Sequence, residues 1–328
     1  SIYSTQNQAM QQICDEEANR DSNYPGLKEY GLDYALTVTR ADGSTQNYGS
    51  NDIKSYVKAT YGKEQGLLYS SEASARAMVE EWKSTIAQEG DTYDERITIT
   101  PQPQSSITIM DQATGEIKAL VGGRGEKASS LGLNRAYQGS KRQPGSTFKI
   151  LAAYAPALDS CDKTLATTID DEPYTLKSGQ VLRNADKQYR GSTTIRQAIT
   201  NSINVVAVKL SDEITQELGY EYCQKFGIST LVKNKTINGQ VFDDSKSQTL
   251  ALGGITEGVY NYEMCAAYAA IANGGVYNKP TLYSKVVDHD GNVLLEGNGD
   301  SHTVIKDSTA YLLTSAMEDV VNEGTGTA

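Results

Sequence analysis

The sequence has few of the residues on which several common catalytic sites depend. It contains two histidines, His289 and His302, and neither stands in a Gly-x-Ser-x-Gly context. This argues against a Ser-His-Asp hydrolase and against a histidine-based metal centre. The four cysteines are widely scattered and form no Cys-x-x-Cys pair, which argues against zinc and thiol-redox motifs. We therefore expect neither a metal nor a cofactor.

Long apolar runs and blocks of like charge are also missing. No stretch approaches the roughly 18 apolar residues of a membrane span, and the opening residues do not have the pattern expected of a signal peptide. The 30 basic and 41 acidic residues are interleaved and give a net charge of −11, so a nucleic-acid partner is not expected. Aromatic residues other than tyrosine are scarce: 21 Tyr stand against 3 Phe and 1 Trp, which indicates hydrated, half-buried surface.

The order of the patterns divides the 328 residues into two regions. Residues 1–100 are expected to hold a strand and three amphipathic helices, at 1–5, 6–20, 51–61 and 72–88. The segment 89–104 carries acidic residues and two prolines, so we place the boundary there. The second region, residues 101–328, follows it.

The second region begins with a predicted hairpin over 105–123 and then becomes helical. Helices are expected at 146–158, 193–200, 204–216 and 261–272. A second hairpin turns at Asp290-Gly291, and a final helix runs from an Asp307 N-cap to about Asn322. Strands on both sides of a run of helices favour an α+β domain, with helices packed on an antiparallel sheet.

The pattern Ser-x-x-Lys, in which a lysine can serve as the base for a serine, occurs three times. The three pairs are Ser55/Lys58, Ser146/Lys149 and Ser160/Lys163. The first lies inside a polar helix and the third follows a helix end, so we expect both on the solvated surface. The middle pair differs, because a proline and a glycine break the chain directly before it in "RQPGSTFKI".

Ser146 is expected at a buried helix start, where free N–H groups and the helix dipole favour an oxyanion. The i, i+3 spacing brings Lys149 onto the same face of the helix. The apolar segment "ILAAYAPALD" would bury the pair and lower the pKa of the lysine toward that of a usable base. The alternative is a simple helix cap beside a lysine that extends to the surface.

A Ser-x-Asn triplet, Ser202-Ile203-Asn204, lies between two predicted helices. A hydroxyl and an amide two residues apart on a tight loop can point the same way. One can then relay a proton while the other binds a peptide group. The alternative is that Ser202 or Asn204 caps the next helix.

Together these motifs match a known set, because Ser-x-x-Lys, Ser-x-Asn and Lys-Thr-Gly mark serine β-lactamases and penicillin-binding proteins. Over about residues 95–328 the chain resembles the transpeptidase domain of class A (bifunctional) penicillin-binding proteins. The opening "IYSTQNQAMQQIC" resembles the connector after their glycosyltransferase domain. The transpeptidase resemblance rests on five segments in order: "SITIMDQATGEIKALVGGR", "NRAYQGSKRQPGSTFKILAAYAPALD", "TTIRQAITNSINVVAVKL", "LALGGITEGVYNYEMCAAYAAIANGGVYNKP" and "VVNEGTG".

The resemblance implies a penicillin-recognising α+β fold, with an antiparallel sheet between helical layers, and a peptidoglycan D,D-transpeptidase. Ser146 would attack the D-Ala-D-Ala carbonyl of a stem peptide while Lys149 takes its proton. Ser202 would relay a proton to the departing D-Ala, and Asn204 would bind substrate amide and help to hold Lys149. The implied partners are a donor stem peptide, an acceptor amine and β-lactams, outside the bacterial cell membrane.

The third motif of the family is missing. The Lys177-Ser178-Gly179 triplet comes in the wrong order, in a predicted hairpin turn, and Lys235-Thr236 has no glycine after it. The closing "EGTGTA" resembles the loop that precedes Lys-Thr-Gly in the family. We therefore expect the fold to be incomplete in this chain, with Lys-Thr-Gly on a C-terminal remainder of the same protein.

Two other functions remain open. A serine β-lactamase shares the first two motifs, and Glu257 with Asn261 fits the Glu-x-x-x-Asn pattern of its deacylating glutamate. A β-lactam sensor or cell-wall-binding scaffold would be acylated without turnover. Release of β-lactam would identify the first, and absence of peptide cross-linking would identify the second.

Overall fold

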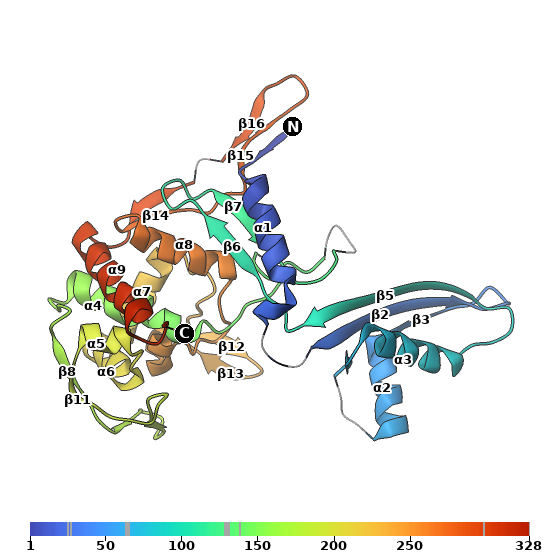
Figure 1. The fold of residues 1–328 in the computed structure, drawn as a ribbon, viewed down its shortest axis with the longest axis horizontal. Coiled ribbons are helices and arrows are strands. Elements are labelled where there is room, and N and C mark those ends of the chain that lie inside the picture. Colours follow the sequence, from blue (N-terminus) through green and yellow to red (C-terminus); the bar gives the residue numbers. More distant parts are fainter. Residues whose placement is uncertain are drawn as a thin grey trace. The chain divides into compact units, whose positions relative to one another are not determined.

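The computed structural model describes residues 1–24, 26, 28–62, 66–127, 132–137, 139–297 and 299–327. The chain forms two compact units with separate hydrophobic cores (Figure 1). Unit 1 comprises Ser1–Gln12, Ile107–Leu120 and Asn134–Ala328, and unit 2 comprises Ile13–Ser106 and Val121–Leu133. The assignment of residues 1–100 to a connector and 101–328 to a transpeptidase domain stays a prediction.

Unit 2 is an antiparallel sheet that carries two helices. The central strand β2 (Glu29–Thr39) pairs with β5 (Thr92–Gln102) over their whole length and also with β3 (Thr45–Gly49) and β4 (Leu68–Tyr69). Helices α2 (Ser50–Tyr61) and α3 (Glu72–Ser84) contact β2. Alternate side chains of β2 pack against both helices to form the core of unit 2: Leu32, Tyr34, Leu36, Val38, Ile53, Val57, Ala75, Val79 and Trp82.

The predicted boundary segment 89–104 is largely a strand. β5 pairs residue by residue with β2, so the backbone of Thr92–Gln102 is hydrogen-bonded in a sheet. The alternating Ile97 and Ile99 pack against the core of unit 2, which explains why a segment with acidic residues and prolines is ordered. Pro101 is tolerated near the end of the strand because β5 has one pairing partner, β2, in the part of the chain that the structure describes.

The strands of unit 1 form short, separate ladders. β6 (Ile107–Met110) and β7 (Ile117–Val121) make the predicted first hairpin, and β15 (Tyr283–Val287) with β16 (Val293–Glu296) makes the second. β1 (Ile2–Ser4) adds to β15, and a parallel bridge between Glu116 and Thr281 links the neighbouring ladders. The other pairs are β8 (Thr168–Asp171) with β11 (Gly191–Thr194), β9 (Tyr174–Thr175) with β10 (Val181–Leu182), β12 (Lys235–Ile237) with β13 (Gln240–Phe242), and β14 (Val276–Asn278) with β17 (Ser301–Thr303).

The helices of unit 1 enclose its core. The first, α1 (Gln8–Asn19), continues into unit 2. The others are α4 (Ala155–Ser160), α5 (Ile195–Thr200), α6 (Asn204–Ile214), α7 (Gln216–Lys225), α8 (Asn261–Ala272) and α9 (Asp307–Asn322). Shorter turns of 3-10 helix are η1 (Asp21–Asn23), η2 (Gly145–Thr147), η4 (Asp244–Lys246) and η5 (Gln248–Leu252), and η3 (Ile150–Tyr154) is a π-helix. None of the described helices is long and apolar enough to cross a membrane.

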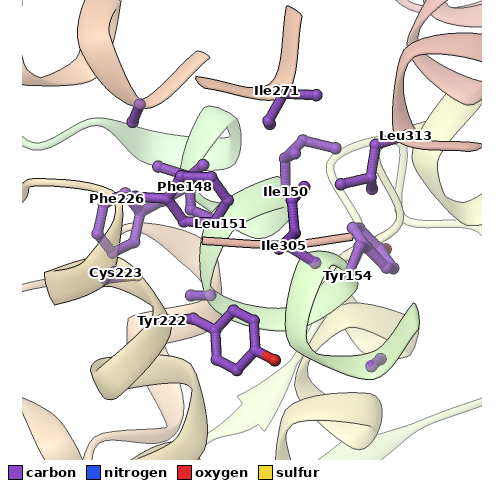
Figure 2. Close-up of a cluster of buried hydrophobic side chains, with 14 of the residues drawn as sticks. Phe148, Ile150, Leu151, Tyr154, Tyr222, Cys223, Phe226, Ile271, Ile305 and Leu313 are labelled. Carbon is purple, nitrogen blue, oxygen red and sulfur yellow. The ribbon is translucent and has the colours of Figure 1, made fainter. Parts of the chain in front are cut away.

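The core of unit 1 surrounds the helical segment that follows Ser146. Figure 2 shows Phe148, Leu151 and Tyr154 within this cluster, together with Phe226 of the turn after α7 and Leu313 of α9. All five side chains are almost inaccessible to solvent. Their burial removes a large apolar area from water and anchors this segment.

The predicted helices at 6–20, 51–61, 193–200 and 261–272 agree with the structure to within two residues at each end. The predicted helix 72–88 ends earlier, at Ser84, and the predicted helix 146–158 is a succession of 3-10, π and α segments. The predicted N-cap Asp307 is instead the first residue of α9, and Lys306 occupies the cap without a side-chain hydrogen bond. The predicted helix 204–216 is α6 and ends at Ile214, because Thr215 takes a positive φ of 78°; the Thr215 hydroxyl caps α7, a helix that the sequence pattern did not predict. The α+β class is confirmed, although the expected single sheet is present as short ladders in the described residues.

Candidate active site

Ser146 lies in η2, the first turn of a helical segment that continues through η3 and α4. Its side chain is exposed, so the expected buried helix start is wrong for the serine itself. Only the residues that follow are buried, beginning with Phe148 and Lys149. Among the described residues the Ser146 hydroxyl has no hydrogen-bond partner. The serine therefore faces away from the core while its helix is anchored in it.

Lys149 makes the hydrogen bonds that join the first two motifs. Its side chain is 2% exposed and directly precedes the π-helix η3. The ammonium donates to the backbone carbonyl of Ser202 at 2.6 Å, to Ser202 Oγ at 3.0 Å and to Asn204 Oδ1 at 2.7 Å. Three donors thus meet three acceptors, and the charged form of the lysine is fully hydrogen-bonded.

Burial lowers the pKa of Lys149 to about 8. The cause is loss of hydration, which disfavours the charged ammonium. No carboxylate lies within ion-pair distance of Lys149 in the described part of the chain, so this effect is not offset by a counter-charge. A lysine with this pKa is a usable proton acceptor near neutral pH.

The loop between α5 and α6 presents Ser202 and Asn204 to the lysine. Ser202 has a φ of 51°, a left-handed conformation that is uncommon for residues other than glycine. Backbone hydrogen bonds from Ser202 N to Ile199 O (3.1 Å) and from Ile203 N to Ala198 O (2.9 Å) hold this turn. The structure therefore brings Lys149, Ser202 and Asn204 together, whereas Ser146 is not hydrogen-bonded to them in the described residues, and the catalytic roles of all four stay predictions.

The chain before Ser146 is fixed by a second segment, residues 253–259. Arg142 and Val259 exchange backbone hydrogen bonds of 3.0 and 2.8 Å, and the Gln143 side chain both donates to and accepts from the backbone of Ile255. Gly253, with φ +74°, packs so closely that an added Cβ would lie 2.3 Å from the Gly145 carbonyl oxygen. The sequence patterns did not predict this contact. The paired glycines of "LALGGITEG" are the sequence feature that could have indicated a close backbone approach here.

The other motif residues do not join this site. Ser55 donates to the carbonyl of Asn51 within α2, and Ser160 donates to the carbonyl of Pro156 within α4. Lys177 is exposed in the turn between β9 and β10, which confirms the predicted hairpin. These side chains have ordinary structural environments.

Glu257 does not have the surroundings of a deacylating base. Its carboxylate pairs with the ammonium groups of Lys141 and Lys235. The hydrogen bond from Lys141, followed by that from Lys235, lowers the pKa of Glu257. His289 and His302 are exposed, as predicted. Within the described ranges, no cluster of His, Cys, Asp and Glu side chains could hold a metal ion.

Comparison with known proteins agrees with this arrangement. Residues 105–328 match the family model of the penicillin binding protein transpeptidase domain. Penicillin-binding protein 1A of Clostridium acetobutylicum is 38% identical over 233 residues, which cover 68% of this chain and 27% of that protein. Penicillin-binding protein 1A/1B of Bacillus subtilis is 29% identical over 240 residues, covering 73% of this chain and 24% of its own length. The chain thus spans about a quarter of these relatives.

A solved structure with a similar fold is the penicillin-binding protein PonA1 from Mycobacterium tuberculosis. It has a TM-score of 0.55 at 24% identity and covers 67% of this chain and 56% of its own. At this identity the likeness concerns the fold. With the family model matching more than half of the chain, and with the relatives named above, the chain belongs to the penicillin-binding protein transpeptidase family.

Proposed function

We propose that this chain carries the peptidoglycan D,D-transpeptidase site of a class A penicillin-binding protein. The observation that supports it most directly is the buried Lys149, hydrogen-bonded to Ser202 and Asn204 three residues after an exposed serine. Membership of the transpeptidase family supports the same reaction. Further support comes from a structural neighbour, penicillin-binding protein A from M. tuberculosis, which has been solved as an imipenem acyl-enzyme complex.

In the acylation step, neutral Lys149 accepts the proton of the Ser146 hydroxyl, and the serine oxygen attacks the carbonyl carbon of the penultimate D-Ala. The backbone N–H of Ser146 is one donor to the developing oxyanion, an interaction of about 3 kcal/mol in such sites. A lysine of pKa about 8 is neutral in about one molecule in ten at pH 7. The exposed position of Ser146 leaves it open to a peptide from solvent.

The leaving group then needs a proton. Ser202 Oγ lies 3.0 Å from Lys149 Nζ, so the proton taken from Ser146 can pass through this hydroxyl to the nitrogen of the departing D-Ala. The C–N bond breaks and an ester to Ser146 remains. An amine of a second stem peptide attacks this ester, forms the cross-link and returns the serine. Asn204 orients the lysine throughout and binds substrate amide.

The remaining elements of the proposal concern the longer protein. The relatives are several times longer than the matched region, which supports a bifunctional glycosyltransferase/transpeptidase with this chain as one part. Its third motif, Lys-Thr-Gly, would then be carried by a C-terminal continuation. Its place would be the outer face of the bacterial cell membrane, where its stem-peptide substrates are assembled into the wall.

The proposal is tested by incubating the protein with a fluorescent penicillin and mapping the adduct by mass spectrometry. Both this chain and a form continued through the Lys-Thr-Gly motif are used. We expect an adduct on Ser146 that Ser146→Ala abolishes. Ser160→Ala is the matched control, because Ser160 also stands three residues before a lysine but hydrogen-bonds within its own helix. Persistent labelling of Ser146→Ala in both forms would refute the nucleophile.

A second measurement separates the competing functions. Donor and acceptor stem peptides are supplied to the labelling-competent form, and the product is analysed for a new peptide bond. A cross-linked product supports the transpeptidase. Labelling without cross-linking would favour the scaffold, and steady release of opened β-lactam would favour the β-lactamase.

A further inference from the structure

The orientation of the Asn204 side chain is fixed from the side opposite Lys149. Its Nδ2 donates to the backbone carbonyl of Arg183 at 3.0 Å. Because that carbonyl can only accept, the amide must turn its Oδ1 the other way, toward the Lys149 ammonium at 2.7 Å. The charged ammonium, which only donates, requires the same orientation, and the segment after β10 keeps it when the lysine is neutral.

The next residue, Asn184, holds the start of α6 to this segment. Its Oδ1 accepts from the backbone N–H groups of Asn204 at 3.0 Å and of Val205 at 3.2 Å. The N-cap of α6, Ile203, has no side-chain cap of its own, so Asn184 takes that function from a distant part of the sequence. Asn184 is 5% exposed, and its hydrogen bonds are therefore made away from water.

Asp171 in turn fixes Asn184. Asn184 Nδ2 lies 2.8 and 3.0 Å from the two carboxylate oxygens of Asp171, which is 1% exposed. Asp171 also accepts from the backbone N–H of Arg190 at 3.0 Å. Asn184 Nδ2 also donates to the backbone carbonyl of Gln188 at 2.8 Å. Since the carboxylate and this carbonyl only accept, the Asn184 amide has a single favourable orientation, with Nδ2 toward Asp171 and Gln188 and Oδ1 toward α6.

We propose that Asp171 and Asn184 are positioning residues of the transpeptidase site, which aim the Asn204 amide oxygen at Lys149. Among the described residues neither is hydrogen-bonded to Ser146 or Lys149, and they act through the start of α6 and the Arg183 carbonyl. The proposal rests on the proposed function, because it gives these two buried residues a part in preparing the base. Nothing in their sequence context distinguishes them from ordinary buried polar residues.

The test uses Asp171→Asn, Asn184→Asp and the double exchange Asp171→Asn/Asn184→Asp, in the penicillin-reactive form of the protein. An amide at 171 offers one acceptor to the two donors of Asn184 and Arg190, so the Asn184 amide is held on this side by the Gln188 carbonyl alone and is less firmly oriented. Asn184→Asp sets two carboxylates against each other. We expect each single variant to lower the acylation rate constant about tenfold. The double exchange again places a donor, now at position 171, opposite an acceptor, now at position 184. Its acylation rate constant should therefore return to within about threefold of the parent value.

A second readout separates positioning from simple loss of stability. Loosening the hydrogen bond from Lys149 to Asn204 removes stabilisation of the ammonium, so the pKa of Lys149 should fall by about half a unit or more in Asp171→Asn. NMR titration of ¹³Cε-labelled lysine measures this directly, with Lys149→Met identifying the signal. This NMR experiment needs no acylation, so it still tests the positioning proposal if the parent protein proves unreactive and the proposed function fails.

Asp186→Asn is the matched control, since Asp186 lies on the same segment but is exposed and pairs with Arg190. It should leave both the rate and the lysine titration unchanged. The positioning role is refuted if Asp171→Asn keeps the parent Lys149 titration and the parent rate per folded molecule. It is equally refuted if the double exchange is no faster than Asn184→Asp.

Discussion

At the scale of single residues, the site depends on one lysine whose three protons all have acceptors. In the charged state Lys149 is committed to Ser202 and Asn204. When it loses a proton, two N–H groups remain for three acceptors and a lone pair appears. The same side chain thus alternates between a structural state that holds the α5–α6 loop and a reactive state that can accept a proton.

The rate of acylation should therefore rise with pH and reach half of its maximum near pH 8, the pKa to which burial lowers Lys149. Below that pH the lysine is protonated and cannot act as a base, which gives the sign of the effect. The measurement is the penicillin acylation rate between about pH 6 and pH 10. A rate that is flat or falls across this range would contradict the role of Lys149.

At the scale of elements, the helical segment after Ser146 is irregular where it is most buried. The π-helix η3 places five successive buried residues, Ile150–Tyr154, against the surrounding helices. Single-turn π-helices are often found at functional sites. Within this segment the hydroxyl of Tyr154 is buried without a hydrogen-bond partner among the described residues.

Replacing this tyrosine tests the cost of that hydroxyl. Tyr154→Phe should raise the free energy of unfolding by about 1 kcal/mol, because an unpaired buried hydroxyl is removed. Tyr222→Phe is the matched control: Tyr222 is similarly buried, but its hydroxyl donates to Asp159 at 2.7 Å, so the change should lower stability by about 1–2 kcal/mol. Denaturant unfolding measures both, and a stability loss in Tyr154→Phe would reveal an unrecognised partner.

The contact between Gly253 and the serine turn is a second element-scale feature. Gly253→Ala should displace the turn, slow penicillin acylation about tenfold and cost about 1–3 kcal/mol of stability. Gly239→Ala serves as the comparison, because Gly239 has a similar φ of +80° but no atom within 4 Å of an added Cβ. It should cost about 1 kcal/mol of stability and leave acylation unchanged. Equal acylation rates in the two variants would show that the close approach is unimportant.

The sequence predicted elements best where a local pattern matched the tertiary environment. The helix 261–272 was predicted with its observed bounds, because an apolar run and a Gly-Gly stop coincide. The strand β2 is not predicted although Leu32, Tyr34, Leu36 and Val38 alternate. β5 lies in the segment that acidic residues and two prolines mark as a boundary, although Ile97 and Ile99 alternate there. In the site, Lys149, Ser202 and Asn204 carry recognisable motifs. Asp171 and Asn184 do not, because their role depends on pairings between distant segments.

At the scale of the whole molecule, the cores of the two units are separate clusters, and unit 1 holds a further small cluster of Leu176, Leu182, Val205 and Val208. Calorimetry should therefore resolve two unfolding transitions. Val79→Ala, in the core of unit 2, should lower the free energy of unfolding of that unit by about 2 kcal/mol and so lower the temperature of one transition. Val206→Ala, in the core of unit 1, should do the same to the other transition. Both valines are fully buried, so they form a matched pair. A single transition that both changes lower equally would show that the units unfold together.

The pairing of β1 with β15 has a consequence for how the fold is completed during synthesis. The backbone N–H of Val287 donates to the carbonyl of Ser1 at 2.9 Å, across a separation of 286 residues. A ribosome that adds about 5–20 residues per second needs between about 15 and 60 seconds to make that much chain. During this time β15 has not been synthesised, so β1, with its exposed Ile2 and Tyr3, lacks the strand with which it pairs in the folded protein. Although β1 is synthesised first, it is therefore among the last strands to pair.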